Sequence, residues 1–223
     1  MNERDENGQG KRGDRQAIEA LRQLQSRKMG IEPAALRRAP PAIVARYADP
    51  WAPVAELAGH LGRYLPAGIL RFLAGHRYGY LVVDWRTSYE PQDALVQGKH
   101  WSHVVHVNLA EVGEPFPCLC AVASLLDHLL GCDGDPAGPW LSEGGGITPP
   151  LSAFGRECLT LYELGYGVDK KARCSRRDYF ARSLTWYAVD RRRLNIADPR
   201  MERLLKHTLM DDRFWSHLLV AGL

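Results

Sequence analysis

The sequence has few cysteines, no excess of charge of one sign and no long hydrophobic run. With 29 Lys and Arg against 26 Asp and Glu, the formal net charge is +3, which gives no electrostatic basis for binding nucleic acid. No apolar run reaches the length of a membrane span, and the polar N-terminus lacks the features of a signal peptide. We therefore expect a cytoplasmic protein that binds neither nucleic acid nor a membrane.

The five cysteines lie at positions 118, 120, 132, 158 and 174. Their number is odd, and their spacing does not match a small disulfide scaffold. A zinc ribbon needs paired Cys-x-x-Cys units, which are also missing. Reduced cysteines without structural zinc are the expectation.

Hydrophobic residues occupy 45% of the 223 positions, enough to bury a core. Apolar spacing predicts helices over 15–30, 54–65, 68–76, 116–131, 151–165, 175–190, 198–210 and 211–221. Runs rich in β-forming residues predict strands over 78–84 and 103–109, the second at or near a sheet edge. The expected fold is α+β and mostly helical, with a small sheet, a central helix and C-terminal helices.

Composition also suggests how the chain is divided. Residues 1–14 are polar and contain glycine, which predicts a disordered tail. Residues 15–52 are expected to form an N-terminal helical extension and a proline-rich linker. Residues 53–223 are expected to form the main domain.

Two short segments carry a resemblance. The central helix contains Cys-Leu-Cys-Ala-Val-Ala-Ser-Leu-Leu-Asp-His at 118–128, and a later helix begins Asp-Tyr-Phe-Ala-Arg at 178–182. Together with the order of the elements, they resemble the zincin domain of anthrax lethal-factor-like metallopeptidases. That family has His-Glu-x-x-His followed by two apolar residues and an Asp, and later Glu-aromatic-Phe-Ala-Glu. The resemblance covers roughly residues 78–215 and implies a zincin-like fold for 53–223.

The resemblance also implies a register on the central helix. Asp127 and the two leucines before it match the family's continuation, which places Cys120 and Ser124 at the two zinc-binding histidine positions. Ala121 then lies at the position of the glutamate that acts as general base. In such an enzyme the two histidines bind zinc and the glutamate activates the zinc-bound water.

The second segment completes the implied site. Asp178 takes the position of the third zinc ligand, and Arg182 replaces the second acid. Tyr166, between two glycines, is the candidate for the family's tyrosine near the third ligand. Arg182 brings a permanent cation that repels a divalent ion, and it could instead pair with Asp178 as a structural tie.

These replacements decide the predicted function. A catalytic zinc needs about three protein ligands and an open position, whereas Cys120, Ser124 and Asp178 offer a thiolate, a poor ligand and a carboxylate. Ala121 cannot act as a base, and a general base contributes ~10²–10⁴ in rate. We expect a catalytically degenerate zincin-like protein without zinc or another cofactor. It would bind a protein or peptide as a regulatory module, through the retained cleft or the N-terminal extension.

An active zinc metallopeptidase with a non-standard ligand set is the first alternative. Its ligands would be Cys120 and Asp178 together with His128 or Glu143. His128 lies one turn after Ser124 on the same helical face. If His128 binds no zinc, it is expected to bond the carbonyls at the end of its helix.

A cysteine-dependent hydrolase built on Cys120 is the second alternative. His128 is too far along the same helix to act as its base, at a rise of about 12 Å. His103 or His106 from the neighbouring strand would be needed. With His100, these form a series spaced by three, but only His100 and His106 would share a strand face. A metal cluster is therefore not expected there.

Three further features have simple interpretations. The glycines at 144–146 lack the Lys-Ser/Thr of a phosphate loop and predict a flexible flap over the cleft. Asp133 and Asp135 predict a turn, because the calcium-loop pattern is absent. The basic stretches 173–182 and 191–193 predict a solvated helix face or, alternatively, a docking surface for an acidic protein.

Overall fold

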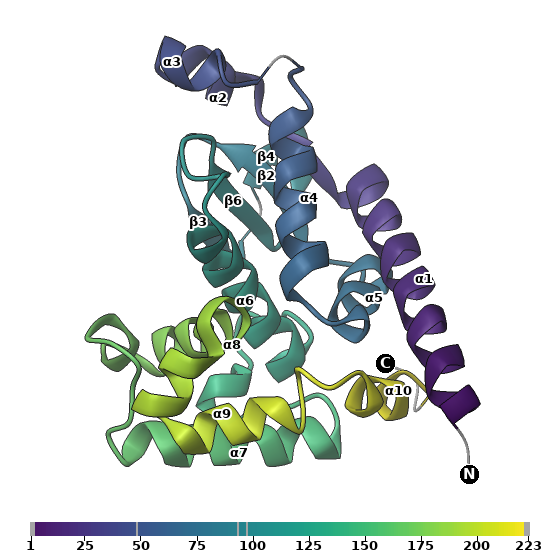
Figure 1. Ribbon diagram of the computed structural model, residues 1–223. Helices are drawn as coiled ribbons and strands as arrows, with labels where there is room; N and C mark the ends of the chain where they lie inside the picture. The colour runs from purple at the N-terminus through teal and green to yellow at the C-terminus, as the bar shows by residue number, and fades with distance from the viewer. Residues whose placement is uncertain (1–2, 48, 93, 97, 221–223) are drawn as a thin grey trace.

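The computed structural model describes residues 3–47, 49–92, 94–96 and 98–220, and it has an α+β fold in which helices predominate (Figure 1). The first half contains α1 (Glu3–Lys28), β1 (Met29–Ile31), α2 (Pro33–Arg38), α3 (Pro41–Val44), α4 (Ala52–Tyr64), α5 (Ala67–Gly75), β2 (Tyr80–Asp84), β3 (Ser88–Glu90), β4 (Ala94–Val96), β5 (Lys99–Trp101) and β6 (Val104–Asn108). The second half contains α6 (Pro115–Cys132), the 3₁₀ turn η1 (Leu141–Glu143), α7 (Pro149–Glu163), the 3₁₀ turn η2 (Lys171–Arg173), α8 (Arg176–Ala197), α9 (Pro199–Lys206) and α10 (Asp212–Val220).

The main sheet has the strand order β1-β2-β6-β3. β1, β2 and β6 are parallel, whereas β3 pairs antiparallel with β6 and lies at the edge. The predicted strands 78–84 and 103–109 correspond to β2 and β6. The second strand was expected at or near a sheet edge, and β6 does lie near one, next to the edge strand β3. The three-residue strand β3 itself is too short to show a sequence pattern.

Alternation along β2 and β6 separates two apolar layers. One face contributes Leu81, Val83, Val105 and Val107 to the main core, which is shared with α4 and α6. The other face forms a small cluster of Val82, Val104 and Val96, the last from the β4–β5 hairpin. Because both faces are covered, the two strands consist mostly of buried residues instead of alternating polar and apolar ones.

The N-terminal segment 15–52 is joined to this core. β1 extends the sheet beyond β2, and Leu24, Met29 and Ile31 are buried in the main cluster. The Lys28 ammonium donates hydrogen bonds to the carbonyls of Leu73, His76 and Tyr78, which fixes the end of α1 beside the end of α5. Buried residues of segment 15–52 and buried residues after position 53 thus belong to one hydrophobic cluster.

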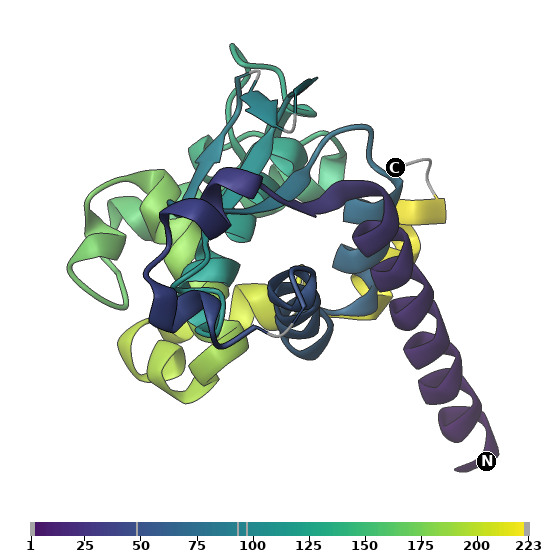
Figure 2. The same ribbon diagram turned by 90° about the horizontal axis from the view of Figure 1, so that it is seen from above.

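α1 is longer at its start than the sequence predicts. It begins at Glu3, inside the stretch 1–14 that was expected to be a tail, and residues 1 and 2 lie outside the described part. Figure 2 shows its first turns projecting beyond the other helices. Once the packed part of a helix is formed, each further residue adds a backbone hydrogen bond without a new nucleation cost.

α6 runs through the centre of the molecule (Figure 1). It is the one helix in the described part that is long and apolar enough to cross a membrane. The prediction that no apolar run reaches the length of a membrane span was therefore wrong. However, 67% of that stretch is buried inside the protein. Its apolar side chains form the core between the sheet and the C-terminal helices, as is typical of a central helix in a globular domain.

α6 also ends later than predicted, at Cys132 with Asp133 in the left-handed conformation. Gly131 was expected to end the helix, but it serves packing: a Cβ there would lie 2.2 Å from the Leu141 backbone nitrogen. The predicted C-terminal helices are confirmed as α7, α8, α9 and α10. α8 continues past its predicted end, with a kink at Asp190 (φ −147°, ψ 78°).

Candidate functional site

A pocket of about 530 Å³ lies where the edge strand β3, helix α6 and helix α8 meet. Its lining residues are Thr87, Ser88, Tyr89, Phe116, Pro117, Cys120, Ala121, Ser124, Lys171 and Arg182. The sequence predicted four of them as former-site positions, namely Cys120, Ala121, Ser124 and Arg182. Two other candidates, Asp178 and Tyr166, are not in the lining.

The α6 wall of the pocket follows from helical geometry. Phe116, Pro117, Cys120, Ala121 and Ser124 are separated by three, four or one positions, which places them on one side of a helix. The opposite side of the helix is apolar and buried in the main core. The Ser124 hydroxyl donates to the Cys120 carbonyl at 3.2 Å. The hydroxyl therefore already has an acceptor within its own helix.

Arg182 forms an ion pair, but not with the residue that the sequence suggested. Its guanidinium Nε and Nη2 lie 2.6–2.9 Å from the two carboxylate oxygens of Asp169. The same carboxylate accepts hydrogen bonds from Trp186 Nε1 and the Ala172 backbone amide. These donors lower the pKa of Asp169 to about 2, although burial opposes the shift. The predicted Arg182–Asp178 tie is thus corrected to a tie between α8 and the loop before η2.

Asp178 has a local role at the start of α8. Ser175 is the N-cap residue, and its hydroxyl accepts the Asp178 amide hydrogen at 3.0 Å. The Asp178 carboxylate in turn accepts from the Ser175 hydroxyl at 2.6 Å. The side chain is exposed and stabilises a helix N-terminus. An acid in the first turn of a helix needs no metal to explain it.

Cys120 is half-buried in the α6 wall of the pocket. Burial raises the pKa of its thiol, although Arg182 and Thr185 nearby act in the opposite direction. A thiol that remains protonated is a weak nucleophile and a weak metal ligand. The five cysteines, all in the described part, form no disulfide.

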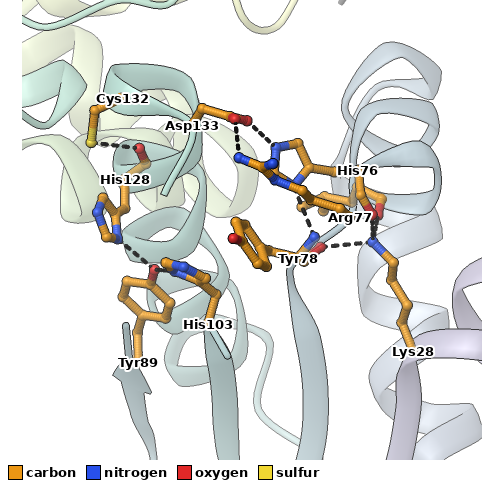
Figure 3. A network of polar contacts seen from close by, with 10 residues as sticks. Lys28, His76, Arg77, Tyr78, Tyr89, His103, His128, Cys132 and Asp133 are labelled. Carbon is orange, nitrogen blue, oxygen red and sulfur yellow. Dashed lines mark hydrogen bonds and ion pairs between the residues drawn. The ribbon is translucent and has the colours of Figure 1, made fainter. Parts of the chain in front are cut away.

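Tyr89 connects β3 to two histidines (Figure 3). Its hydroxyl lies 2.8 Å from Nδ1 of His103 and 2.8 Å from Nδ1 of His128. His128 Nε2 lies 3.0 Å from the Asp135 carbonyl, which can only accept. His128 is therefore protonated at Nε2, accepts from Tyr89 at Nδ1, and Tyr89 accepts from His103. The expectation that His128 bonds helix-end carbonyls is corrected: its ring is buried between Tyr89 and Trp140.

The other two histidines of the 100–106 series lie elsewhere. His106 is buried on the sheet face covered by the hairpin, with Nδ1 2.8 Å from the Asp84 carboxylate and Nε2 3.5 Å from Glu90. His100 is exposed on β5 in the separate hairpin. The expected shared strand face of His100 and His106 was wrong, because they lie on strands of two different sheets, and His103 between them has a positive φ of 59°. None of the histidines in this series lines the Cys120 pocket.

The residues of the alternative zinc site are engaged separately. Glu143 accepts from the Trp140 amide at 3.1 Å and from Arg177 at 2.9 Å. His128 uses both ring nitrogens, as described above. Tyr166 packs against the core with Arg200 above its ring. Across the described residues, no group of three or more His, Cys, Asp or Glu side chains is arranged to hold a metal ion.

The glycines at 144–146 form a tightly packed corner, which corrects the expectation of a flexible flap. A Cβ on Gly145 would lie 2.1 Å from the Pro139 carbonyl oxygen, and one on Gly146 2.1 Å from the Ser152 nitrogen. Gly144 has a positive φ of 89°. Glycine is needed here because two backbone segments approach too closely for a side chain.

The expected turn at Asp133 and Asp135 is confirmed. Asp135 accepts the Ala137 amide hydrogen, as in an Asx turn. Asp133 accepts from Arg77 and bonds His76 Nε2 at 2.8 Å (Figure 3). The basic stretch of α8 is exposed at Arg176, Arg177 and 191–193.

Asp127 holds the packed corner in place. It is fully buried and accepts from the Ser142 amide at 2.7 Å and the Ser142 hydroxyl at 2.6 Å. Burial raises the pKa of Asp127 to about 7, although both Ser142 bonds oppose the shift. The aspartate that fixed the register of the resemblance therefore attaches α6 to η1.

Asp127→Asn is expected to change how stability depends on pH. With its pKa raised from 3.8 to about 7, the folded carboxyl keeps a proton that the unfolded one loses, so stability falls as pH rises between these values. Asparagine does not titrate. Relative to the wild type, the free energy of unfolding of the variant should therefore rise by at most about 1.4 kcal/mol for each pH unit across that window. Urea unfolding of both proteins at several pH values tests this, and a difference independent of pH would contradict it.

Sequence reasoning missed six of the ten lining residues, Lys171 and Tyr89 among them, and also Asp169, the partner of Arg182. Asp169 carries no motif, and its thirteen-residue separation from Arg182 matches no helical or strand repeat. Lys171 was one of many basic residues near α8. Tyr89 belongs to a strand too short for a periodic signal. A search for an acid among the cations at 169–182 would have found only Asp169 and Asp178.

Comparisons of the chain with protein-family models, with curated proteins and with solved structures gave no match.

Proposed function

We propose that this chain is a catalytically degenerate zincin-like protein that binds an extended peptide between β3 and α6. The observation that carries the proposal is the position of Cys120, Ala121 and Ser124. They lie on one face of α6, in a pocket bordered by an antiparallel edge strand. The residues at the two former histidine positions and at the base position thus share one cleft, and none of the three is the histidine or glutamate of the family. A regulatory or adaptor role needs binding but no turnover.

The edge strand supports the peptide as the class of ligand. In the described part of the chain, no strand pairs with the outer edge of β3. Backbone N–H and C=O groups at such an edge can bond an extended segment, and a neighbouring pocket can receive its side chains. Tyr89 fixes β3 to α6 through His128. The strand is therefore held in position before a peptide arrives, which lowers the entropic cost of binding.

The two enzymatic alternatives have less support. The Asp178 side chain is exposed and bonded to Ser175, and both His128 nitrogens are engaged. For a cysteine hydrolase, burial raises the pKa of the Cys120 thiol, and His106 lies on the opposite sheet face. We place the protein in the cytoplasm, supported by five cysteines without a disulfide.

Selection from a displayed library of random peptides tests the proposal. We expect bound peptides that remain intact with and without added zinc. Their affinity should fall at least about tenfold when alternate amides are N-methylated, because this removes the donors to β3. Ser124→Trp, which fills the pocket, should cause a similar loss. Ser216→Trp at an exposed position of α10 is the matched control.

Two results would contradict the proposal. Cleavage of the selected peptides that stops with a chelator would favour the active metallopeptidase. Binding that is equally strong in Ser124→Trp and Ser216→Trp would place the peptide outside the pocket. Circular dichroism of both variants shows whether the fold is retained.

A further inference from the structure

The pocket wall carries cations but no acid. Among the described residues that line it, Lys171 and Arg182 are basic and none is Asp or Glu. Tyr89 and Cys120 add no negative charge, because burial raises the pKa of both side chains. The lining therefore has a positive balance, in contrast to the nearly even balance of the whole chain.

The two cations are not equivalent. Arg182 is bound by both oxygens of Asp169, so its charge is largely compensated. Lys171 has no ion pair within the described part of the chain and is exposed at the pocket rim. Lys170 and Arg173, its neighbours on the same turn, are also exposed. The uncompensated charge at the pocket therefore centres on Lys171.

Another part of the pocket wall is apolar. Phe116, Pro117 and Ala121 line it. Charge–charge attraction is larger beside such low-dielectric walls than on an open surface, and field lines concentrate in a cleft. The Lys171 ammonium at this pocket therefore attracts a carboxylate.

We infer that the peptide bound between β3 and α6 is acidic, with an Asp or Glu carboxylate seated against the Lys171 ammonium. This inference rests on the proposed function and names its ligand class. The β3 edge contributes affinity without regard to sequence, through the peptide backbone. Lys171 provides the preference for acidic peptides, because an acidic side chain opposite its ammonium is attracted and a basic one is repelled.

Three synthetic fluorescent peptides that differ only at the central residue test the inference. They share an extended sequence of alternating Thr and Val and carry Glu, Gln or Lys at the centre. By fluorescence anisotropy at low salt, we expect the Glu peptide to bind about tenfold more tightly than the Gln peptide, and the Lys peptide to bind weakest. Lys171→Gln should abolish the preference for Glu. Lys206→Gln, an equal charge change on α9 outside the pocket, should keep it.

The possible failures are distinguishable. Equal binding of the three peptides, unchanged by Lys171→Gln, would overturn the acidic selection and leave peptide binding intact. Binding of none of them, together with a failed library selection, would remove the proposed function and this inference with it. Displacement of the Glu peptide by a single-stranded DNA oligonucleotide at lower concentration than by the unlabelled peptide would assign the site to a nucleic acid and overturn the inference.

Discussion

Gly155→Ala is expected to destabilise the protein by about 3 kcal/mol or more, the upper range for overpacking a core. A Cβ at this position in α7 would lie 2.2 Å from the Gly145 carbonyl oxygen and 2.7 Å from that of Leu141. Both are backbone atoms of the packed corner, so no side chain can rotate away. For a domain of this size, the melting temperature should fall by roughly 6–12 °C. Thermal unfolding followed by circular dichroism measures it.

Gly59→Ala is the matched control, because it makes the same change in another helix, α4. Apart from its chain neighbours and the backbone of its own helix, no atom of the described residues lies within 4 Å of the Cβ that alanine would add there. The substitution should be neutral or stabilise the protein by up to about 1 kcal/mol, through the higher helix propensity of alanine. Equal melting temperatures of the two variants would show that α7 does not approach the corner as described.

Asp169→Ala is expected to lower the free energy of unfolding by about 2–4 kcal/mol, because it breaks a partly buried ion pair. The Asp169 carboxylate holds Arg182, Trp186 Nε1 and the Ala172 amide, and its side chain is only 18% exposed. Removing it leaves the guanidinium without its counter-charge and frees the loop before η2, the turn that carries Lys171. Urea unfolding measures the loss. Peptide binding at the pocket should weaken as well.

The pH dependence provides a second measurement of the same bond. The pKa of Asp169 is lowered from 3.8 to about 2, so its contribution to stability is fully present above 3.8 and is lost as pH falls towards 2. The shift corresponds to about 2 kcal/mol. The wild type should lose its advantage over Asp169→Ala in that window, because both proteins then lack the charged carboxylate.

Asp178→Ala distinguishes the Arg182–Asp169 pair of the structure from the Arg182–Asp178 pair that the sequence suggested. Asp178 is exposed, and among the described residues its carboxylate bonds only its own N-cap serine, so its loss should lower the free energy of unfolding by about 1 kcal/mol or less. If Asp178→Ala proved more damaging than Asp169→Ala, Arg182 would pair with Asp178 after all. The ion pair described for α8 would then be wrong.

The fold was largely predictable wherever apolar periodicity extends over several turns. Predicted segments match the central helix α6, the helices α7, α8 and α9, and the strands at 80–84 and 104–108. Short elements were not predictable. β1 and β3 have three residues each and gain their stability from partners distant in sequence, so no local pattern reveals them.

The candidate site was predictable in part. The spacing of Cys120, Ala121 and Ser124 determines that they share a helix face, whatever surrounds it. Whether that face borders a pocket depends on where β3 and α8 pack. The partner of Arg182 could not be read from the sequence, because Asp178 is closer along the chain while Asp169 is closer in space.

By itself, the sequence determined the helical periodicity, the charge balance and the residue types on the α6 face, since these depend only on local spacing and composition. Tertiary structure alone decided which carboxylate holds Arg182, that His128 bonds Tyr89, and that Lys171 at the pocket rim forms no ion pair with another described residue. The physical reason is that ion pairs and hydrogen bonds act over a few ångströms. The fold, and not the order of residues, brings those atoms together.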